Sequence, residues 1–355
     1  MTARRVSVGI VNHNGESYLM QTLRAVARLG PAVDDVLLID SGSTDEGVPL
    51  AREQFPRVRV IELGANLGPG AARNRAISEA AHDRVLLIDN DVEPQLGSAE
   101  ALATALDGHP NAILAMAAVL YERAPDTVQY AGAAPHFLGT TAPLQADTPV
   151  AELDDVVRVV GSAISCCLMV DRARFGDRRW FDERLFIYQE DHELGLRASL
   201  QGYDCLVVPA ARCLHRAGTI GVSVRETGRF TPLRVRHTIR NRWLTLLMLY
   251  QAGTLLRFAP ALATFELLQL LGAVRKGWLS HWLWATGSTA RLLPHVLRVR
   301  RAMRTSRRRG DLEILTAGPF PFNPRWQSSA PERAAQHALD LVAQLNWRLA
   351  GGHAP

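Results

Sequence analysis

The stretch Arg84-Val-Leu-Leu-Ile-Asp-Asn-Asp-Val-Glu-Pro94 fixes the kind of fold that this chain adopts. Its four apolar residues, Val85 to Ile88, predict a strand that is buried on both faces of a sheet. The strand ends on two carboxylates, Asp89 and Asp91. Two acids at the rim of an apolar sheet repel each other and lose solvation unless a cation lies beside them, which indicates a hard metal ion. A strand-to-loop turn capped by Asp and Asn is the alternative interpretation of this stretch alone.

The first hundred residues alternate between strand and helix patterns. Apolar runs predict three further strands, at Val6–Val11, Val36–Ile39 and Val58–Leu63. Helical spacing and a proline suited to a first turn predict two helices, over Ser17–Leu29 and from Gly68-Pro69 through Ile77. Repeated β-α units indicate an α/β fold with a mostly parallel, Rossmann-like sheet and helices on both faces. Ligands of such sheets bind at the carboxyl ends of the strands, where Asn12, Asp40 and Asp89 fall.

Residues 111–160 have a weaker pattern. A strand is predicted at Ala112–Leu120, followed by loops and a β-ribbon that could cover a substrate. Regular patterns return in three places: a strand or strand pair over Val159–Val170, a helix over Asp191–Leu200, and a strand-like region at Cys205–Leu214. Gly202 can end the helix.

The composition is that of an ordinary globular protein. The 355 residues are 47% hydrophobic and 21% charged, which leaves room for one large or two modest domains. The four cysteines form no CxxC pair, which predicts buried, reduced thiols. Because the N-terminal residues lack the apolar core of a secretory signal, we expect a cytoplasmic protein.

Positive charge gathers towards the C-terminus. No acidic residue occurs between Leu267 and Arg309, and Arg291–Arg309 holds eight arginines. A solvated basic tail is one interpretation, and an anionic membrane surface or nucleic acid are the others. Nucleic acid is the least supported, because no recognition module accompanies the arginines.

Apolar segments rich in tryptophan precede this basic run. The charge-free windows Trp243–Leu256 and Gly277–Ala290 hold fourteen residues each, whereas a spanning helix needs ~20. Arginines and a lysine punctuate the segments, which favours helices that lie in the membrane interface. The alternative is a helical layer packed on the catalytic domain or on another subunit.

Five motifs in order resemble the nucleotide-sugar glycosyltransferases of family 2, rhamnosyltransferase-like enzymes with the GT-A fold. The motifs are Val8-Gly-Ile-Val-Asn-His-Asn-Gly15, Leu37-Leu-Ile-Asp-Ser-Gly-Ser-Thr-Asp45, Asn66-Leu-Gly-Pro-Gly-Ala-Ala-Arg-Asn74, the Asp89-Asn-Asp91 triplet, and Glu190-Asp191 followed by His215-Arg216. The resemblance covers about residues 5 to 220. No GxGxxG follows the first strand, which argues against a dinucleotide site.

The resemblance implies roles for the donor side of the site. Asp40 would accept hydrogen bonds from the base or ribose of the nucleotide, with Asn12 nearby at the end of the first strand. Asn66 and Arg73 match positions that help to hold the nucleotide. The triplet would bind Mg²⁺ or Mn²⁺, with Asp91 a surer ligand than Asp89.

The resemblance also implies roles for the later motifs. His215 matches a position that can bind metal or diphosphate. Asp191 is the candidate general base, which would take the proton of an acceptor hydroxyl in a single inverting displacement. Glu190 would orient the site, and Trp180 is a further candidate for contact with substrate.

Together these patterns predict an inverting, metal-dependent glycosyltransferase. Its donor would be a UDP-, dTDP- or GDP-sugar, and its acceptor a glycan or lipid-linked hydroxyl at the cytoplasmic face of the membrane, as in polysaccharide and cell-envelope synthesis. The chain is predicted to divide into a transferase domain over 1–225, an amphipathic helical membrane-surface or packing region over 226–310 and a tail over 311–355. The sequence leaves open whether the protein forms a homo-oligomer. The rivals are a nucleotidyltransferase of related fold and a catalytically silent membrane-associated scaffold.

Overall fold

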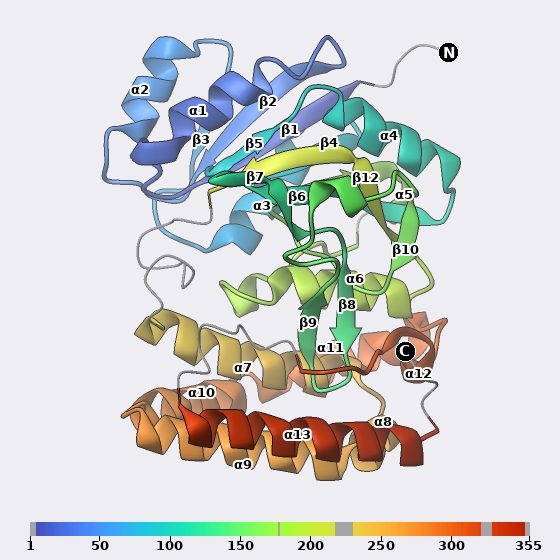
Figure 1. Ribbon diagram of the computed structural model, residues 1–355. Helices are drawn as coiled ribbons and strands as arrows, with labels where there is room; N and C mark the ends of the chain where they lie inside the picture. The colour runs from blue at the N-terminus through green and yellow to red at the C-terminus, as the bar shows by residue number, and fades with distance from the viewer. Residues whose placement is uncertain (1–4, 177, 217–229, 321–328, 352–355) are drawn as a thin grey trace. The chain divides into compact units, whose positions relative to one another are not determined.

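A computed structural model describes residues 5–176, 178–216, 230–320 and 329–351 of the protein (Figure 1). The chain folds into two compact units. The first comprises Met1–Ala133, Pro143–Ala198 and Tyr203–Ile220, and the second Ala134–Ala142, Ser199–Gly202 and Gly221–Pro355. The predicted domain border between residues 225 and 226 lies outside the described residues, so the predicted division of the chain stays a prediction.

A large mixed sheet forms the centre of the first unit (Figure 1). Its strands are β1 (Val6–Asn12), β2 (Val33–Asp40), β3 (Arg59–Glu62), β4 (Arg84–Asp89), β5 (Val92–Pro94), β6 (Ala112–Tyr121), β7 (Ala124–Tyr130), β10 (Arg158–Val160), β11 (Cys167–Asp171) and β12 (Asp204–His215). The main order is β10-β12-β6-β11-β4-β1-β2-β3, while β5 pairs with β12 and β7 with β6. Strands β3, β2, β1 and β4 run parallel, and β11 lies antiparallel between β4 and β6.

Strand β4 is buried on both faces, as its sequence predicts. Leu86 and Ile88 belong to one apolar core and Val85 and Leu87 to the other, and all four are fully buried. Helices α1 (Glu16–Val26), α2 (Gly47–Gln54) and α4 (Ser98–Gly108) contribute to the first core. Helices α3 (Pro69–Glu79), α5 (Arg172–Phe175) and α6 (Glu190–Leu200) contribute to the second. The predicted α/β fold with helices on both faces of a central sheet is therefore confirmed.

Two helices were not predicted, and the structure decides between a strand and a strand pair over Val159–Val170. No residue range was predicted for α2 or α4; α2 is short and contains Pro49. The region Val159–Val170 forms two strands, β10 and β11, which pair with different neighbours. Small residues link them, and a β-carbon on Gly195 of α6 would lie 2.3 Å from the backbone nitrogen of Ala163. Glycine at position 195 therefore allows α6 to approach the backbone of the link closely.

The second unit is mainly helical. It contains the hairpin of β8 (Ala133–His136) and β9 (Thr140–Pro143) and the helices α7 (Pro232–Leu249), α8 (Ala252–Arg257), α9 (Ala259–Arg275), α10 (Leu279–Arg291), α11 (Leu293–Ser306), α12 (Asp311–Ile314) and α13 (Ala330–Leu349). Helices α10 and α11 pack on α7, and α13 lies along α9 (Figure 1). Among the described residues, no helix combines the length and apolarity needed to cross a bilayer.

Buried polar contacts join α7 to α9 in the second unit. Arg242 of α7 is 1% exposed and forms an ion pair with Glu266 of α9. The indole nitrogen of Trp243 donates a hydrogen bond of 2.7 Å to the same carboxylate. All four cysteines of the chain, which lie in the first unit, are buried and form no disulfide, as predicted.

Candidate active site

The ends of β1, β2 and β4 are joined by a chain of polar side chains. Asn12 lies beside Asp40 in the parallel register of β1 and β2. Its amide nitrogen donates to Asp40 Oδ1 at 2.8 Å, and the backbone nitrogen of Ser43 donates to Asp40 Oδ2 at 2.9 Å. Asn90, which follows β4, donates to the amide oxygen of Asn12 at 2.8 Å. The structure thus brings the predicted residues Asn12 and Asp40 to the same sheet edge as the triplet.

Gly15 keeps this edge closely packed. A β-carbon there would lie 2.2 Å from both Asn12 Oδ1 and Asn90 Nδ2. Neither atom can move away without losing the Asn90-to-Asn12 hydrogen bond. The glycine after β1 is therefore required by the hydrogen-bonded contact between the two strand ends.

The three side chains of the Asp89-Asn90-Asp91 triplet bind three different partners. Asp89 accepts a hydrogen bond of 2.6 Å from Arg73, whereas Asn90 donates to Asn12. Asp91, which is 5% exposed, has its Oδ2 atom 3.5 Å from Nε2 of His215. The repulsion between the two acids is therefore relieved by separate positively charged or polarisable partners.

His215, at the end of β12, is oriented by Gln129 of β7. The ring atom Nδ1 lies 2.8 Å from Gln129 Oε1, and an amide oxygen can only accept, so Nδ1 carries a hydrogen and Nε2 faces Asp91. Burial lowers the pKa of His215, but the hydrogen bond to Asp91 and the nearby negative charges outweigh it and raise the pKa to about 9. A cation bound at Nε2 would replace the second ring proton.

Asp91 and His215 fit two ligand positions of a divalent cation. Ligands about 2.0–2.2 Å from a metal lie roughly 3 Å apart in neighbouring positions, close to the observed 3.5 Å between Asp91 Oδ2 and His215 Nε2. A ligating histidine normally donates its other ring hydrogen to a fixed acceptor, as His215 does to Gln129. No group of three or more acid, histidine or cysteine side chains within the described ranges is arranged to hold a metal. A cation here would need further ligands from the substrate or water.

Arg73 of α3 joins the triplet to α6. It is 3% exposed, and its second guanidinium nitrogen donates to Glu190 Oε1 at 2.8 Å. Burial lowers the pKa of Arg73, but the charges of Asp89 and Glu190 outweigh it and raise the pKa above its usual range. In this structure the side chain predicted to hold the nucleotide therefore makes its ion pairs with two acids of the site.

Glu190 and Asp191 form the first turn of α6 and differ in accessibility. Glu190 is 5% exposed, and burial together with the charge of Asp191 raises its pKa to about 7 against the opposing charge of Arg73. Its Oε2 atom is buried without a hydrogen-bond partner in the part of the chain that the structure describes. Asp191 is only partly buried, so an acceptor can reach it more readily than Glu190.

Asp191 is held by backbone and hydroxyl donors. Its Oδ2 atom accepts from the backbone nitrogen of Ser165 at 3.2 Å and from the Ser165 hydroxyl at 3.5 Å. Its Oδ1 atom accepts from the backbone nitrogen of His192 at 2.8 Å. Desolvation raises the pKa of Asp191 above its usual value despite the lowering effect of Arg73. A fixed carboxylate with a raised pKa suits a general base.

A buried ionic network anchors α6 behind these acids. Glu193 accepts hydrogen bonds from Arg197 at 2.8 Å and from Arg179 at 2.9 Å. His192, also fully buried, lies 2.7 Å from the Ser162 hydroxyl. The first turn of α6 is therefore held in place by contacts on its inner face.

Asn66 and Trp180 lie outside these contacts. Asn66 is exposed, and its side-chain oxygen accepts from the backbone nitrogen of Gly68 at 3.0 Å, which shapes the turn before α3. Trp180 is 7% exposed, and its ring centroid lies 4.5 Å from that of Phe175 in the apolar core. Substrate contact by these two residues stays a prediction.

Sequence reasoning missed three residues that orient the predicted ones: Asn90, Gln129 and Ser165. Asn90 could have been found as the middle residue of the triplet. Gln129 and Ser165 carry no sequence signal of their own, because sheet pairing and the link before β11 bring them to His215 and Asp191.

Part of this site lies in a region whose sequence matches a known protein family. Residues 7–152 match the family described as glycosyl transferase family 2. These residues form a family 2 glycosyl transferase domain. The matched range contains Asn12, Asp40 and the triplet and ends before Glu190, Asp191 and His215.

Two curated proteins are similar to parts of this chain. The chain is 34% identical over 204 residues to the N-acetylglucosaminyl-diphospho-decaprenol L-rhamnosyltransferase of Mycobacterium tuberculosis, a match that spans 51% of this chain and 66% of the relative. It is 29% identical over 89 residues to an uncharacterized glycosyltransferase of Haemophilus influenzae, which covers 24% of this chain and 36% of that protein.

A solved structure shows the same fold. The crystal structure of GalNAc-T7 with UDP, GalNAc and Mn²⁺ superposes with a TM-score of 0.59 at 16% identity, covering 82% of this chain and 57% of the other. The predicted GT-A fold is therefore confirmed for the glycosyl transferase domain.

Proposed function

We propose that this chain is an inverting glycosyltransferase, which moves a sugar from a nucleoside diphosphate sugar to a hydroxyl group. The contact that supports the proposal most is the Arg73 bridge, because it joins Asp89 of the triplet to Glu190 of the α6 first turn. Through that bridge the donor side and the acceptor side of the reaction share one site. The family 2 domain over residues 7–152 supports the same reaction class.

Asp191 is the proposed general base. It would accept the proton of the acceptor hydroxyl while that oxygen attacks the anomeric carbon, so that the product has the inverted configuration. Ser165 fixes the orientation of the Asp191 carboxylate, and Glu190 orients the site through Arg73.

Asp91 and His215 are the proposed protein ligands of Mg²⁺ or Mn²⁺. When bound, such a cation neutralises charge on the departing diphosphate. Asp89, which is paired with Arg73, would support this site by holding Arg73. Gln129 fixes the ring of His215 so that Nε2 is directed towards the cation position.

The proposed donor is a UDP-, dTDP- or GDP-sugar bound at the ends of β1 and β2. Asp40 and Asn12 are held rigidly there by hydrogen bonds to each other and to Ser43. The hydrogen bond from Gly68 to Asn66 shapes the turn before α3, and the first backbone N–H groups of that helix can face an anion.

The proposed acceptor is lipid-linked or a glycan at a membrane surface. The Mycobacterium tuberculosis relative bears the name of an enzyme acting with a diphospho-decaprenol compound. In the second unit, α9 exposes Leu267, Leu271 and Val274 at 55–57%, and α13 exposes Leu341, Leu345 and Leu349 at 58–79%. We call these two rows the leucine stripes.

The leucine stripes favour peripheral binding to the cytoplasmic face of the membrane. Their spacings of three or four residues place each row on one face of its helix, and α9 and α13 pack together. Large exposed apolar surfaces mark interaction sites, and the acid-free sequence from Leu267 to Arg309 suits an anionic lipid surface.

Thermal unfolding with a donor panel tests the proposed function. UDP-, dTDP- and GDP-sugars are added to the full chain with Mn²⁺, and one nucleotide class is expected to raise the melting temperature. The increase should fall when EDTA replaces Mn²⁺ and in the Asp91→Asn variant. If no nucleotide sugar stabilises the wild-type protein in either condition, the proposal is wrong.

A further inference from the structure

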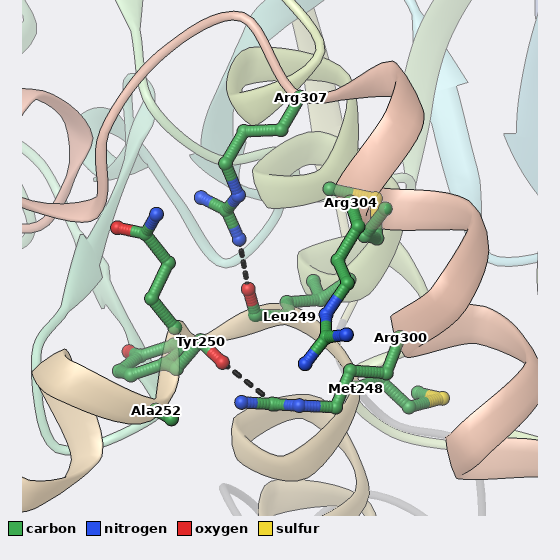
Figure 2. A pocket seen from close by; sticks show the side chains of 9 residues that line it. Met248, Leu249, Tyr250, Ala252, Arg300, Arg304 and Arg307 are labelled. Carbon is green, nitrogen blue, oxygen red and sulfur yellow. Dashed lines mark hydrogen bonds between the residues drawn. The ribbon is translucent and has the colours of Figure 1, made fainter.

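One pocket lies wholly within the second unit. It has a volume of about 280 Å³ and is lined by the end of α7, the start of α8 and one face of α11. Figure 2 shows three guanidinium groups on the side that faces the end of α7, those of Arg300 and Arg304 of α11 and of Arg307, the residue that follows α11. We call this the arginine pocket.

Two of the three arginines cap α7. Arg300 donates to the carbonyl oxygens of Leu247 and Tyr250, both at 2.7 Å, and Arg307 donates to that of Leu249 (Figure 2). The last carbonyls of a helix lack partners within the helix, so these contacts explain why the side chains are held there. They fix the positions of the guanidinium groups without cancelling the full positive charges.

The acid beside the pocket cannot neutralise the positive charges of all three arginines. Asp311 is the acid beside it, and its carboxylate already accepts from Arg307 at 2.6 Å and from the backbone nitrogen of Gln251 at 2.7 Å. Arg304 is exposed and has no ion pair or hydrogen bond among the described residues. Desolvation, and then the charges of Arg304 and Arg307, lower the pKa of Arg300 against the opposing effect of Asp311. An anion would relieve this repulsion.

The size and lining of the pocket limit the class of anion that can bind there. Guanidinium groups bind phosphate oxygens in pairs, and several on one helix face suit a phosphate or diphosphate. Met248, Leu249 and Met303 supply apolar wall, and Gln251 is the one uncharged amide side chain of the lining. Sites for drug-sized ligands span roughly 300–1,000 Å³, so this volume suits a headgroup better than a nucleotide sugar.

We propose that the arginine pocket binds the phosphate group of an anionic amphiphile, with Arg304 as the free cation that contacts it. The apolar wall receives the part of the chain next to the phosphate. The site is separate from the residues proposed for sugar transfer, all of which lie in the first unit. Its ligand chemistry could come from a lipid phosphate or from free diphosphate, and the test below distinguishes these sources.

Calorimetric titration of the full chain tests the pocket. The probes are a short-chain isoprenyl diphosphate, below its micelle concentration, and inorganic pyrophosphate, both in EDTA. The variant Arg304→Gln is compared with Arg298→Gln, which removes the same charge from an exposed position of α11 outside the pocket lining. Because donor sugar and divalent cation are absent, the result is independent of the transfer reaction.

Wild-type protein should bind the isoprenyl probe more tightly than pyrophosphate. Arg304→Gln should weaken that binding about tenfold or more, the effect of losing a charged hydrogen bond. Arg298→Gln should change it less than about threefold, because exposed charges are screened. Equal binding of the two probes would show that free diphosphate is a sufficient ligand, and it would overturn the proposal that the ligand is an amphiphile. Equal effects of the two variants, or no binding by wild-type protein, would overturn the site.

Discussion

Buried charged side chains have different roles in the two units. In the first unit, acids collect at the ends of strands and at the start of α6, where burial raises the pKa values of Glu190 and Asp191. In the second unit, Arg242 pairs with Glu266 and Arg307 with Asp311, and these pairs tie helices to one another. Neither buried charge nor an unpaired carboxylate oxygen therefore marks a reactive site by itself, because Glu266 Oε2 also lacks a hydrogen-bond partner among the described residues. A raised carboxyl pKa, as for Glu190 and Asp191, does mark one.

The two units also differ in the side chains that they expose to solvent. The first unit places its chemistry among buried residues, whereas the second exposes the leucine stripes and a row of arginines. We therefore expect substitutions in the first unit to change the chemical step or metal binding. Substitutions on the second unit should change attachment and leave the reaction intact.

The largest effect is expected from Asp191→Asn. The amide keeps the size of the side chain but cannot accept the acceptor proton, so kcat should fall roughly 10²–10⁴-fold. Donor binding, followed by calorimetry, should stay within about threefold of wild type, because Asp191 contacts Ser165 and His192 rather than the ends of β1 and β2. A variant that turns over within about tenfold of wild type would show that Asp191 is not the base.

Gln129→Leu should weaken metal binding. Gln129 is 2% exposed and fixes the His215 ring, so its loss should raise the Mn²⁺ concentration for half-maximal activity about 10–100-fold. Activity at saturating Mn²⁺ should largely return. The same substitution at the exposed Gln344 of the second unit is the control. Identical metal dependence in both variants would exclude a metal role for His215.

Leu271→Glu should separate attachment from chemistry. A carboxylate in the middle of the α9 stripe should lower binding to vesicles of anionic phospholipid about tenfold, since it removes apolar contact and adds repulsion. Transfer to a water-soluble acceptor should stay unchanged. Leu96→Glu provides the control, because Leu96 is 81% exposed in the first unit. If both variants bind vesicles equally well, the stripes do not contact the membrane.

The smallest effect compares the acid stability of the two units. Burial lowers the pKa of His192 in the first unit and of His136 in the second to about 4. An unfolded histidine takes up a proton below about pH 6.5, so the free energy of unfolding should fall as the pH drops from there towards 4. Between pH 7 and 5 each histidine should account for about 2 kcal/mol.

Urea unfolding at pH 7 and 5 measures this loss. His192→Gln and His136→Gln should each show a smaller decrease than wild type. Decreases as large as that of wild type in both variants would mean that neither histidine is neutral in the folded protein.

Much of the first unit could be predicted because its signals are local. Apolar runs that end on Asn12, Asp40 and Asp89 predict both the strands and the edge at which these side chains meet, and the observed register joins them. Gln129 and Ser165 could not be found in this way. They come from strand β7 and a link before β11, and only sheet pairing and the packing of α6 bring them to the site.

The second unit was less predictable for a physical reason. The segments rich in tryptophan predict helices in a membrane interface. In the structure Trp243, Trp278, Trp282 and Trp284 are partly buried against an apolar cluster. The exposed apolar residues are leucines and a valine instead. Helical periodicity shows that a helix has an apolar face, but it cannot tell a face packed on a neighbour from a face left open.

The most direct test of the central claim is the stereochemistry of the product. Wild-type protein is incubated with Mn²⁺, the stabilising nucleotide sugar and a water-soluble acceptor, and the anomeric protons are followed by NMR. We predict one nucleoside diphosphate released for each sugar transferred, with the anomeric configuration opposite to that of the donor. A product that retains the donor configuration, or no release of nucleoside diphosphate, would contradict a single displacement assisted by Asp191.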